Sequence, residues 1–158
     1  MRAGVVDVFV VRAAGRGWQH LALRRSVGTR CPGTWEAVHG KIESGESPPE
    51  AARRELREET GLECLRLYAL TVNPFFLATT GVVELAVAFV AVVDPSAVVV
   101  LGEEHDDGVW LSRAAARRRY HWPRERESLD HIAVLFKGGH AGAAEDVLRI
   151  FPALDRLI

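Results

Sequence analysis

Short apolar runs alternate with polar, glycine-bearing segments over the first two thirds of the chain. The first two runs predict strands at residues 5–11 and 19–25, joined by a turn that contains glycine. A loop is expected at residues 26–34, and a strand-like segment follows it at 35–38. Later apolar runs predict further strands at residues 65–72, 82–93, 97–101 and 108–111.

Helical patterns lie in the middle and at the end of the chain. Residues 123–137 and 142–150 carry apolar side chains at helical spacing, and residues 114–119 predict a short helical turn. Strands mixed with helices favour an α+β layer architecture. A length of 158 residues with 48% hydrophobic content suits one domain, residues 1–158, with a substantial core and no linker.

The middle helix has a clear start and a clear end. Ser47 is a hydroxyl N-cap, Pro48 is suited to the first helical position, and Glu50 completes a capping box. Gly61 is the matching stop.

The acidic face of this helix is the main chemical signal in the sequence. Glu55, Glu58 and Glu59 stand at i, i+3 and i+4, so their carboxylates leave one side of the helix close together. Like charges at this spacing cost roughly 0.2–0.5 kcal/mol per pair. A divalent cation would remove that repulsion, and carboxylate oxygens suit magnesium or manganese. A purely solvated acidic face is the alternative reading.

Residues 40–62, called the box below, resemble the signature of the Nudix hydrolases. That signature is a glycine, five residues, a glutamate, seven residues, and then Arg-Glu-aliphatic-x-Glu-Glu-x-Gly-aliphatic. The matching positions here are Gly40, Glu46, Arg54, Glu55, Leu56, Glu58, Glu59, Gly61 and Leu62. The resemblance implies a Nudix-type α/β/α sandwich with a mixed sheet, in which the box forms a loop, a helix and a loop. It also implies a Mg²⁺- or Mn²⁺-dependent enzyme that cleaves a nucleoside diphosphate linked to another group.

A second acidic segment, residues 102–107, precedes the last predicted strand. An ordinary solvated loop is its simplest interpretation. Many Nudix enzymes take a further metal-binding glutamate from a loop in this place, so the resemblance implies Glu104 as that ligand, with Glu103 as the alternative. His105 is expected to orient a neighbour, because magnesium prefers oxygen ligands. The metal set implied is Gly40, Glu55, Glu58, Glu59 and Glu104.

The sequence around the box resembles the branch of the family that hydrolyses dihydroneopterin triphosphate and nucleoside triphosphates. The entry into the box, Trp-Glu-Ala-Val-His-Gly at residues 35–40, is similar to the W-x-x-V-T-G of that branch, with His39 in place of threonine. Gly40 or His39 would then present a backbone carbonyl to the metal. The His39 side chain is expected to contact substrate or a group beside the metal, with mere packing as the alternative.

The remaining roles follow from charge and shape. Arg54 is expected to pair with Glu46 and so hold the helix against the loop. The general base is Glu58 or Glu55, since either carboxylate accepts a proton from water. Arg30, and with it Arg24 and Arg25, is a candidate for outer phosphates. Two aromatic side chains, Phe75 and Phe76, are candidates to stack a base or pterin, whereas Trp110 is expected in the core.

Charge and cysteine content narrow the possible partners and the compartment. The net charge of −1 and the pI near 6.6 give no general basic field for nucleic acid or a membrane surface. The two cysteines form no CxxC pair, and Asp7 interrupts the apolar N-terminal run, which argues against a signal peptide. A cytoplasmic protein is expected.

The expected function is hydrolysis of a diphosphate linkage in a small nucleotide-like molecule, either a nucleoside triphosphate or dihydroneopterin triphosphate. The alternatives are a dinucleoside polyphosphate or nucleotide-sugar hydrolase, a non-catalytic Nudix ligand sensor, and a plain cation-binding protein. A homodimer is possible if the apolar strand at residues 82–93 lies at a sheet edge.

Overall fold

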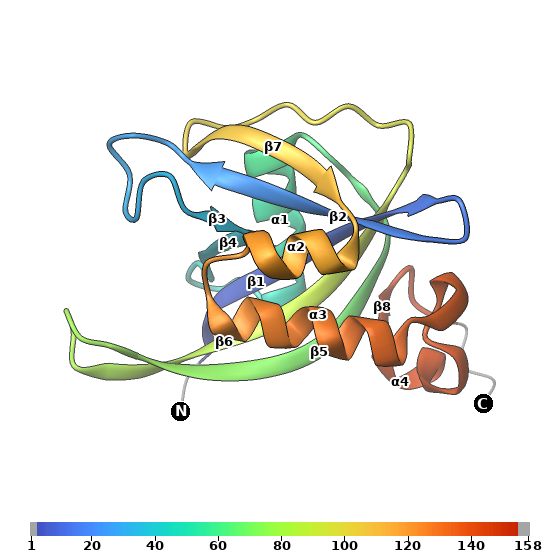
Figure 1. Ribbon diagram of the computed structural model, residues 1–158. Coiled ribbons are helices and arrows are strands. Elements are labelled where there is room, and N and C mark those ends of the chain that lie inside the picture. The colour runs from blue at the N-terminus through green and yellow to red at the C-terminus, as the bar shows by residue number, and fades with distance from the viewer. Residues whose placement is uncertain (1–2, 155–158) are drawn as a thin grey trace.

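A mixed sheet forms the centre of the computed structural model, which describes residues 3–154 (Figure 1). Eight strands in this part of the chain have the order β3-β2-β1-β6-β5-β8, with β4 paired to β1 and β7 paired to β2. Only the β1–β6 pair is parallel, and the other pairs are antiparallel. The strands are β1 Ala3–Ala14, β2 Gly17–Arg25, β3 Trp35–Glu36, β4 Val38–Lys41, β5 Cys64–Leu77, β6 Val82–Val93, β7 His105–Leu111 and β8 Arg149–Phe151.

Helices cover both faces of this sheet. Figure 1 shows α1 (Pro48–Thr60) behind it and α2 (Arg113–Arg119) and α3 (Pro123–Leu135) in front. A shorter C-terminal segment holds two 3₁₀ turns, Lys137–Gly139 and Gly142–Ala144, and α4 (Glu145–Leu148). The α+β class and the three-layer arrangement are as expected from the sequence.

Strand β1 shows why the core has two halves. Val6, Val8 and Val10 belong to the cluster under α1, whereas Phe9 and Val11 belong to the cluster under α2 and α3. Side chains alternate between the two faces of a strand, so a strand covered on both faces is apolar almost throughout.

The predicted ends of the box helix are confirmed. The Ser47 N–H donates to the Glu50 carboxylate over 2.8 Å, and Pro48 begins the helix. Gly61 ends it with a φ of 68°, the left-handed conformation that glycine adopts without a Cβ clash.

Two segments differ from the prediction. Residues 97–101 form no strand, because their backbone bonds to the end of α1 instead of to the sheet: Val100 N–H donates to the Thr60 carbonyl and Gly102 N–H to the Glu59 carbonyl. Residues 142–150 form no continuous helix. Their last part becomes β8, which pairs with the edge of β5 near Leu67 and Tyr68.

The long strands β5 and β6 form a hairpin that extends beyond the helical layers in Figure 1. Strand β5 continues through Pro74, which is tolerated because β8 pairs with β5 only further back, so this side of the strand needs no donor. Strand β6 lies between β1 and β5. The alternative that residues 82–93 are an edge strand is therefore wrong.

None of the helices in residues 3–154 combines the length and the apolar character that crossing a membrane requires.

Removing part of the α1 contact should destabilise the fold. Leu56 is 1% exposed and packs in the cluster under α1. We expect Leu56→Ala to lower the free energy of unfolding by about 2–5 kcal/mol, through lost burial and the cavity it leaves. Urea denaturation measures this change. The control Val134→Ala, at a side chain that is 70% exposed, should change stability by less than about 0.5 kcal/mol.

Candidate active site

Arg54 holds the box loop against the box helix. Its Nε and Nη2 donate to the two oxygens of Glu46 over 2.8 and 2.9 Å, and Nη2 also donates to the Lys41 carbonyl. Its Nη1 reaches Glu55 at 2.7 Å and Glu58 at 3.2 Å. The expected Arg54–Glu46 pair is confirmed, and these hydrogen bonds hold the pKa of Glu46 at about 2.

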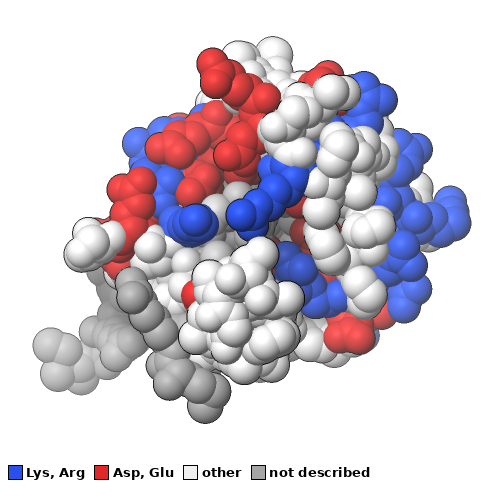
Figure 2. Space-filling view, turned by 90° about the vertical axis from the view of Figure 1, so that its left-hand side faces the viewer, with Lys and Arg blue, Asp and Glu red and all other residues white. Residues whose placement is uncertain are grey.

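Five carboxylates meet at one cavity of about 200 Å³. The box helix supplies Glu55, Glu58 and Glu59, and the loop before β7 supplies Glu103 and Glu104. Figure 2 shows acidic side chains gathered on the α1 side of the molecule and basic ones on the side of α2 and α3. The structure thus brings together the acidic residues that the sequence nominated, and it places both alternatives, Glu103 and Glu104, at the same cavity.

Glu59 lies deepest in this group. It is 4% exposed, and neither of its carboxylate oxygens has a hydrogen-bond partner among the described residues. Burial, followed by the negative charges of Glu55 and Glu36, raises its pKa well above the ordinary value. Burial also raises the pKa of Glu55, although Arg54 opposes the shift.

These residues fit a divalent cation. In residues 3–154 no three acidic, imidazole or thiol groups are arranged closely enough to hold an ion as they stand. Unpartnered buried oxygens among several like charges are nevertheless costly, and a hard cation is the ligand that would stabilise them. Gly40 lies against this group, since a Cβ at residue 40 would fall 1.9 Å from the carboxyl carbon of Glu55.

A network of buried polar side chains lies next to Glu59. His105 Nε2 lies 3.0 Å from Glu36, and its Nδ1 lies 3.8 Å from Glu59. Arg25 donates to the same Glu36 oxygen over 2.8 Å. Burial alone would raise the pKa of Glu36, but the hydrogen bonds from His105 and Arg25 lower it. His105 thus contacts carboxylates, as an orienting residue would. Sequence reasoning missed Glu36, whose only signal was an acid inside a strand-like segment.

A second polar cluster lies on the other face of the sheet, beside α3. Asp7 is fully buried and accepts from His39 Nδ1 at 2.6 Å and from Arg124 Nε at 3.0 Å. Burial alone would raise the pKa of Asp7, but the hydrogen bonds from His39 and Arg124 and the charge of Arg124 lower it. Sequence reasoning missed Asp7 and Arg124 as site residues. The signal for Asp7 was available, because it is the one charge in the predicted strand at residues 5–11.

The two predicted aromatic residues point to opposite faces. Phe75 lies under the Arg124 guanidinium at 5.6 Å, beside the cluster of Asp7 and His39, and Trp122 lies at a similar distance from Arg124. Phe76 faces the α1 side and is 66% exposed. The structure therefore brings Phe75, but not Phe76, together with Arg124.

The arginines nominated for outer phosphates are largely engaged elsewhere. Arg24 pairs with Asp106, and Arg25 pairs with Glu36. The Arg30 side chain is exposed, and its carbonyl accepts a hydrogen bond from Arg25. Trp110 is half-buried and packs against the core, as expected.

The family model for the NUDIX domain matches residues 1–132 of the chain. The protein belongs to the Nudix family. The match includes the whole box and the loop of Glu104, as well as Asp7, His39, Phe75 and Arg124.

Relatives within and around this family differ widely in activity. An octanoyltransferase of Myxococcus xanthus is 34% identical over 126 residues, which are 78% of this chain but only 35% of that protein. The chain therefore spans about a third of that relative. A solved Ap4A hydrolase of C. elegans has a TM-score of 0.68 at 20% identity, covering 82% of this chain and 94% of its own. The E. coli dihydroneopterin triphosphate pyrophosphohydrolase has a TM-score of 0.64 at 24% identity, with the same coverages. These two structures show the shared fold alone.

The buried Asp7 should make stability depend on pH in a defined direction. Its pKa in the folded protein lies below the ordinary 3.8. Its ionised form therefore stabilises the fold above that value, and the contribution is lost as the pH falls through the lower, folded value. We expect Asp7→Asn to lower the free energy of unfolding at pH 7 by about 3 kcal/mol, because Arg124 loses its buried partner.

Urea denaturation at several pH values tests this. The difference between the native chain and Asp7→Asn should shrink steadily as the pH is lowered from about 5 to about 2. A difference that stays constant over that range would show that Asp7 is not ionised in the fold. Asp130→Asn is the control: Asp130 is 43% exposed, so its loss should cost less than about 1 kcal/mol.

Proposed function

We propose that this protein is a metal-dependent hydrolase that cleaves the diphosphate linkage of a small nucleotide-like substrate. The observation that carries the proposal is the group formed by Glu55, Glu58, Glu59 and Glu104 at one cavity, with both Glu59 oxygens unpartnered. A merely solvated acidic helix face does not need a fully buried carboxylate. A non-catalytic sensor would not need every carboxylate of the box.

The box residues would share the work of hydrolysis. Glu55, Glu58, Glu59 and Glu104 would hold the cation, with the Gly40 carbonyl as a further oxygen. A bound magnesium or manganese ion would supply Lewis acidity and neutralise the charge of the diphosphate. Glu58 is 58% exposed on the cavity side of the helix, whereas Glu55 is 12% exposed and bonded to Arg54. Glu58 is therefore placed to meet the attacking water and take its proton, with Glu55 as the alternative base.

Arg54 acts here as a positioning residue. It fixes Glu55 and Glu58 through its own N–H groups and ties them to the loop through Glu46. The carboxylates are thus held in place before substrate arrives, which lowers the cost of organising the transition state.

The second cluster would bind the part of the substrate that is not phosphate. His39 and Gly40 are adjacent on β4, so one strand presents His39 to the α3 side and Gly40 to the box helix. A substrate with its diphosphate at the carboxylates would reach Phe75 and Arg124 across β4. An aromatic ring that stacks on Phe75, with Arg124 beside it, suits a nucleobase or pterin. We therefore propose a nucleoside triphosphate or dihydroneopterin triphosphate as substrate.

Other substrates remain outcomes of the test. The likeness to an Ap4A hydrolase keeps dinucleoside polyphosphates as the first alternative, followed by nucleotide sugars. Octanoyl transfer is not proposed, because the chain matches about a third of the octanoyltransferase and the box accounts for a different reaction.

Turnover should depend on the box carboxylates and on added metal. We expect release of phosphate or pyrophosphate from one substrate class with Mg²⁺, and its loss with EDTA. Glu58→Gln should lower kcat by about 10²–10⁴-fold, as removal of a general base does. The matched control is Glu63→Gln, which makes the same change just beyond the helix at a side chain that is 62% exposed. Equal losses in both variants would contradict the proposed role of Glu58.

Phe75 and Phe76 form a natural pair of neighbours for testing substrate binding. Base stacking on an aromatic side chain is worth about 1–3 kcal/mol, so Phe75→Ala should raise KM about tenfold or more with a smaller change in kcat. Phe76→Ala, on the opposite face, should leave KM within about twofold. Steady-state kinetics on the substrate found above measures both. The reverse order would place the substrate on the α1 face of the hairpin.

A further inference from the structure

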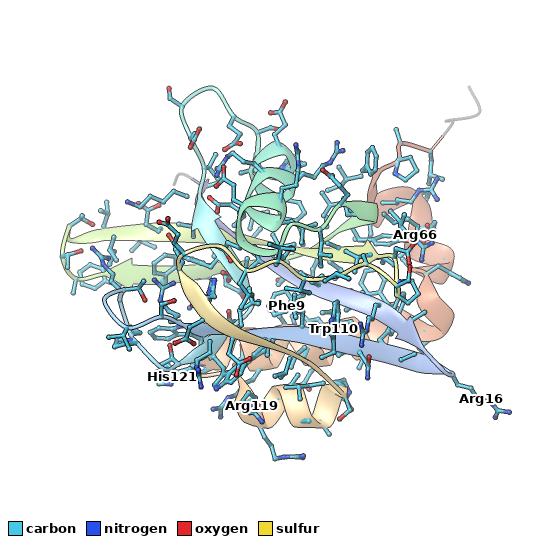
Figure 3. All side chains as sticks on the ribbon, turned by 90° about the horizontal axis from the view of Figure 1, so that it is seen from above. Phe9, Arg16, Arg66, Trp110, Arg119 and His121 are labelled. Carbon is cyan, nitrogen blue, oxygen red and sulfur yellow. The ribbon has the colours of Figure 1, made fainter. Side chains whose placement is uncertain are left out.

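A second and larger cavity lies at the other end of the sheet. It has a volume of about 510 Å³ and is walled by Trp18 at the start of β2, by Leu65, Arg66 and Tyr68 of β5, and by the C-terminal segment. Figure 3 shows Arg66 beside this segment, at the end of the molecule away from His121. The cavity shares no lining residue with the carboxylate cavity.

The C-terminal wall is an addition to the family domain. Gly139, His140, Glu145 and Arg149 line the cavity, and all four lie beyond residue 132, where the match to the family model ends. The segment is fixed to the sheet by β8 and by the Trp18 indole N–H, which donates to the Phe136 carbonyl. The cavity therefore lies between the sheet and the C-terminal segment, and it is separate from the box.

The Glu145 carboxylate in this cavity already has hydrogen-bond partners within the protein. Glu145 accepts from the Tyr68 hydroxyl and the Ala141 N–H, each over 2.9 Å, and from Arg149 at 3.4 Å. Burial alone would raise the pKa of Glu145, but these hydrogen bonds and the charge of Arg149 lower it. Glu145 is thus ionised and balanced by Arg149.

The charge of Arg66, by contrast, is not balanced. One of its N–H groups donates to the Gly139 carbonyl over 2.9 Å, and none of the carboxylates in residues 3–154 forms an ion pair with it. A guanidinium carries five N–H donors, so most of those of Arg66 are left for a ligand. With Glu145 and Arg149 paired, Arg66 is the one arginine of the described lining that has no carboxylate partner.

Apart from His140 and the Tyr68 hydroxyl, the rest of the lining is apolar. Trp18, Leu65, Val92, Val93 and Pro95 surround the charged end. Gly139 has a φ of 91°, and a Cβ added there would make an ordinary van der Waals contact with the Trp18 ring at 3.5 Å. One guanidinium at the side of an apolar recess of this volume is the composition of a small-molecule site.

We propose that this cavity is a second binding site, for a small anion carried on an apolar body. The head group would be a carboxylate or a phosphate held by Arg66, because a guanidinium binds either through paired N–H donors. The apolar body would lie along Trp18 and Leu65. No residue of the box lines this cavity, so binding would require neither a metal ion nor the carboxylates of the box.

The experiment is a titration of the ¹⁵N-labelled full chain, without metal ion, followed through the indole N–H signal of Trp18 and the backbone amide of Arg66. Phenylacetate and phenyl phosphate are the two anionic probes, and phenylacetamide is the neutral match. We expect saturable shifts of both signals with at least one anion, and none with the amide. The anion that binds with the higher affinity shows whether the site prefers a carboxylate or a phosphate head group.

Variants assign the charge to Arg66. Arg66→Gln should weaken binding at least tenfold, whereas Arg66→Lys, which keeps the charge, should weaken it less. Arg118→Gln, an exposed arginine on α2, is the control and should bind normally. Arg66→Gln could fail as a test by disturbing the C-terminal segment. In that case the proposal is decided by whether the unmodified chain binds the anionic probes but not phenylacetamide. No saturable shift up to about 10 mM, equal binding of the amide, or shifts confined to the box would each overturn the proposal.

Discussion

The hydrogen bonds of Arg54 are the interaction on which the carboxylate cavity depends. Glu55, Glu58 and Glu59 repel one another, and burial makes the repulsion worse at Glu59. Arg54 is the cation that the chain itself provides, and it reaches Glu46, Glu55 and Glu58 at once. Its guanidinium neutralises part of the acidic face and ties the loop to the helix. It leaves both Glu59 oxygens without a hydrogen bond to any described residue, which is why we propose Glu59 as a ligand of the cation.

The short strand β4 links this group to the second cluster. Gly40 allows the Glu55 side chain to lie against the strand, which any Cβ at that position would prevent. The next residue back, His39, points to the opposite face and is fixed there by Asp7. Asp7 is tolerated inside the sheet because His39 and Arg124 both donate to it. One fully buried carboxylate therefore positions both His39 and Arg124 on the far side of the strand from the box, and the Arg124 guanidinium lies over Phe75.

How far the sequence predicts this structure depends on how many residues separate two contacting side chains along the chain. Partners that are close in sequence were predicted from their spacing. These are the helix caps at Ser47 and Gly61 and the pair Arg54–Glu46. Glu104 was predicted through family resemblance, because its loop is far from the helix in sequence. Asp7 and Arg124 are 117 residues apart and Glu36 and His105 are 69 apart, so no local pattern joins them. Residues 97–101 are apolar enough for a strand, yet their backbone forms hydrogen bonds with the end of α1. This pairing depends on tertiary structure and has no local sequence signal.

This division also explains why the reaction is easier to predict than the substrate. The groups proposed to act on the diphosphate are concentrated in one contiguous segment with fixed spacing, with only Glu104 added from elsewhere. The residues proposed to contact the remainder of the substrate come from β1, β4, β5 and α3, and they meet only because the sheet and α3 are packed as they are. A change at any one of these positions alters the recess near Phe75 without altering the box. The Ap4A and dihydroneopterin triphosphate hydrolases share this fold at nearly equal TM-scores. We therefore propose that the cluster of Asp7, His39, Phe75 and Arg124 governs substrate selection in this chain, and that the box carries out the chemistry.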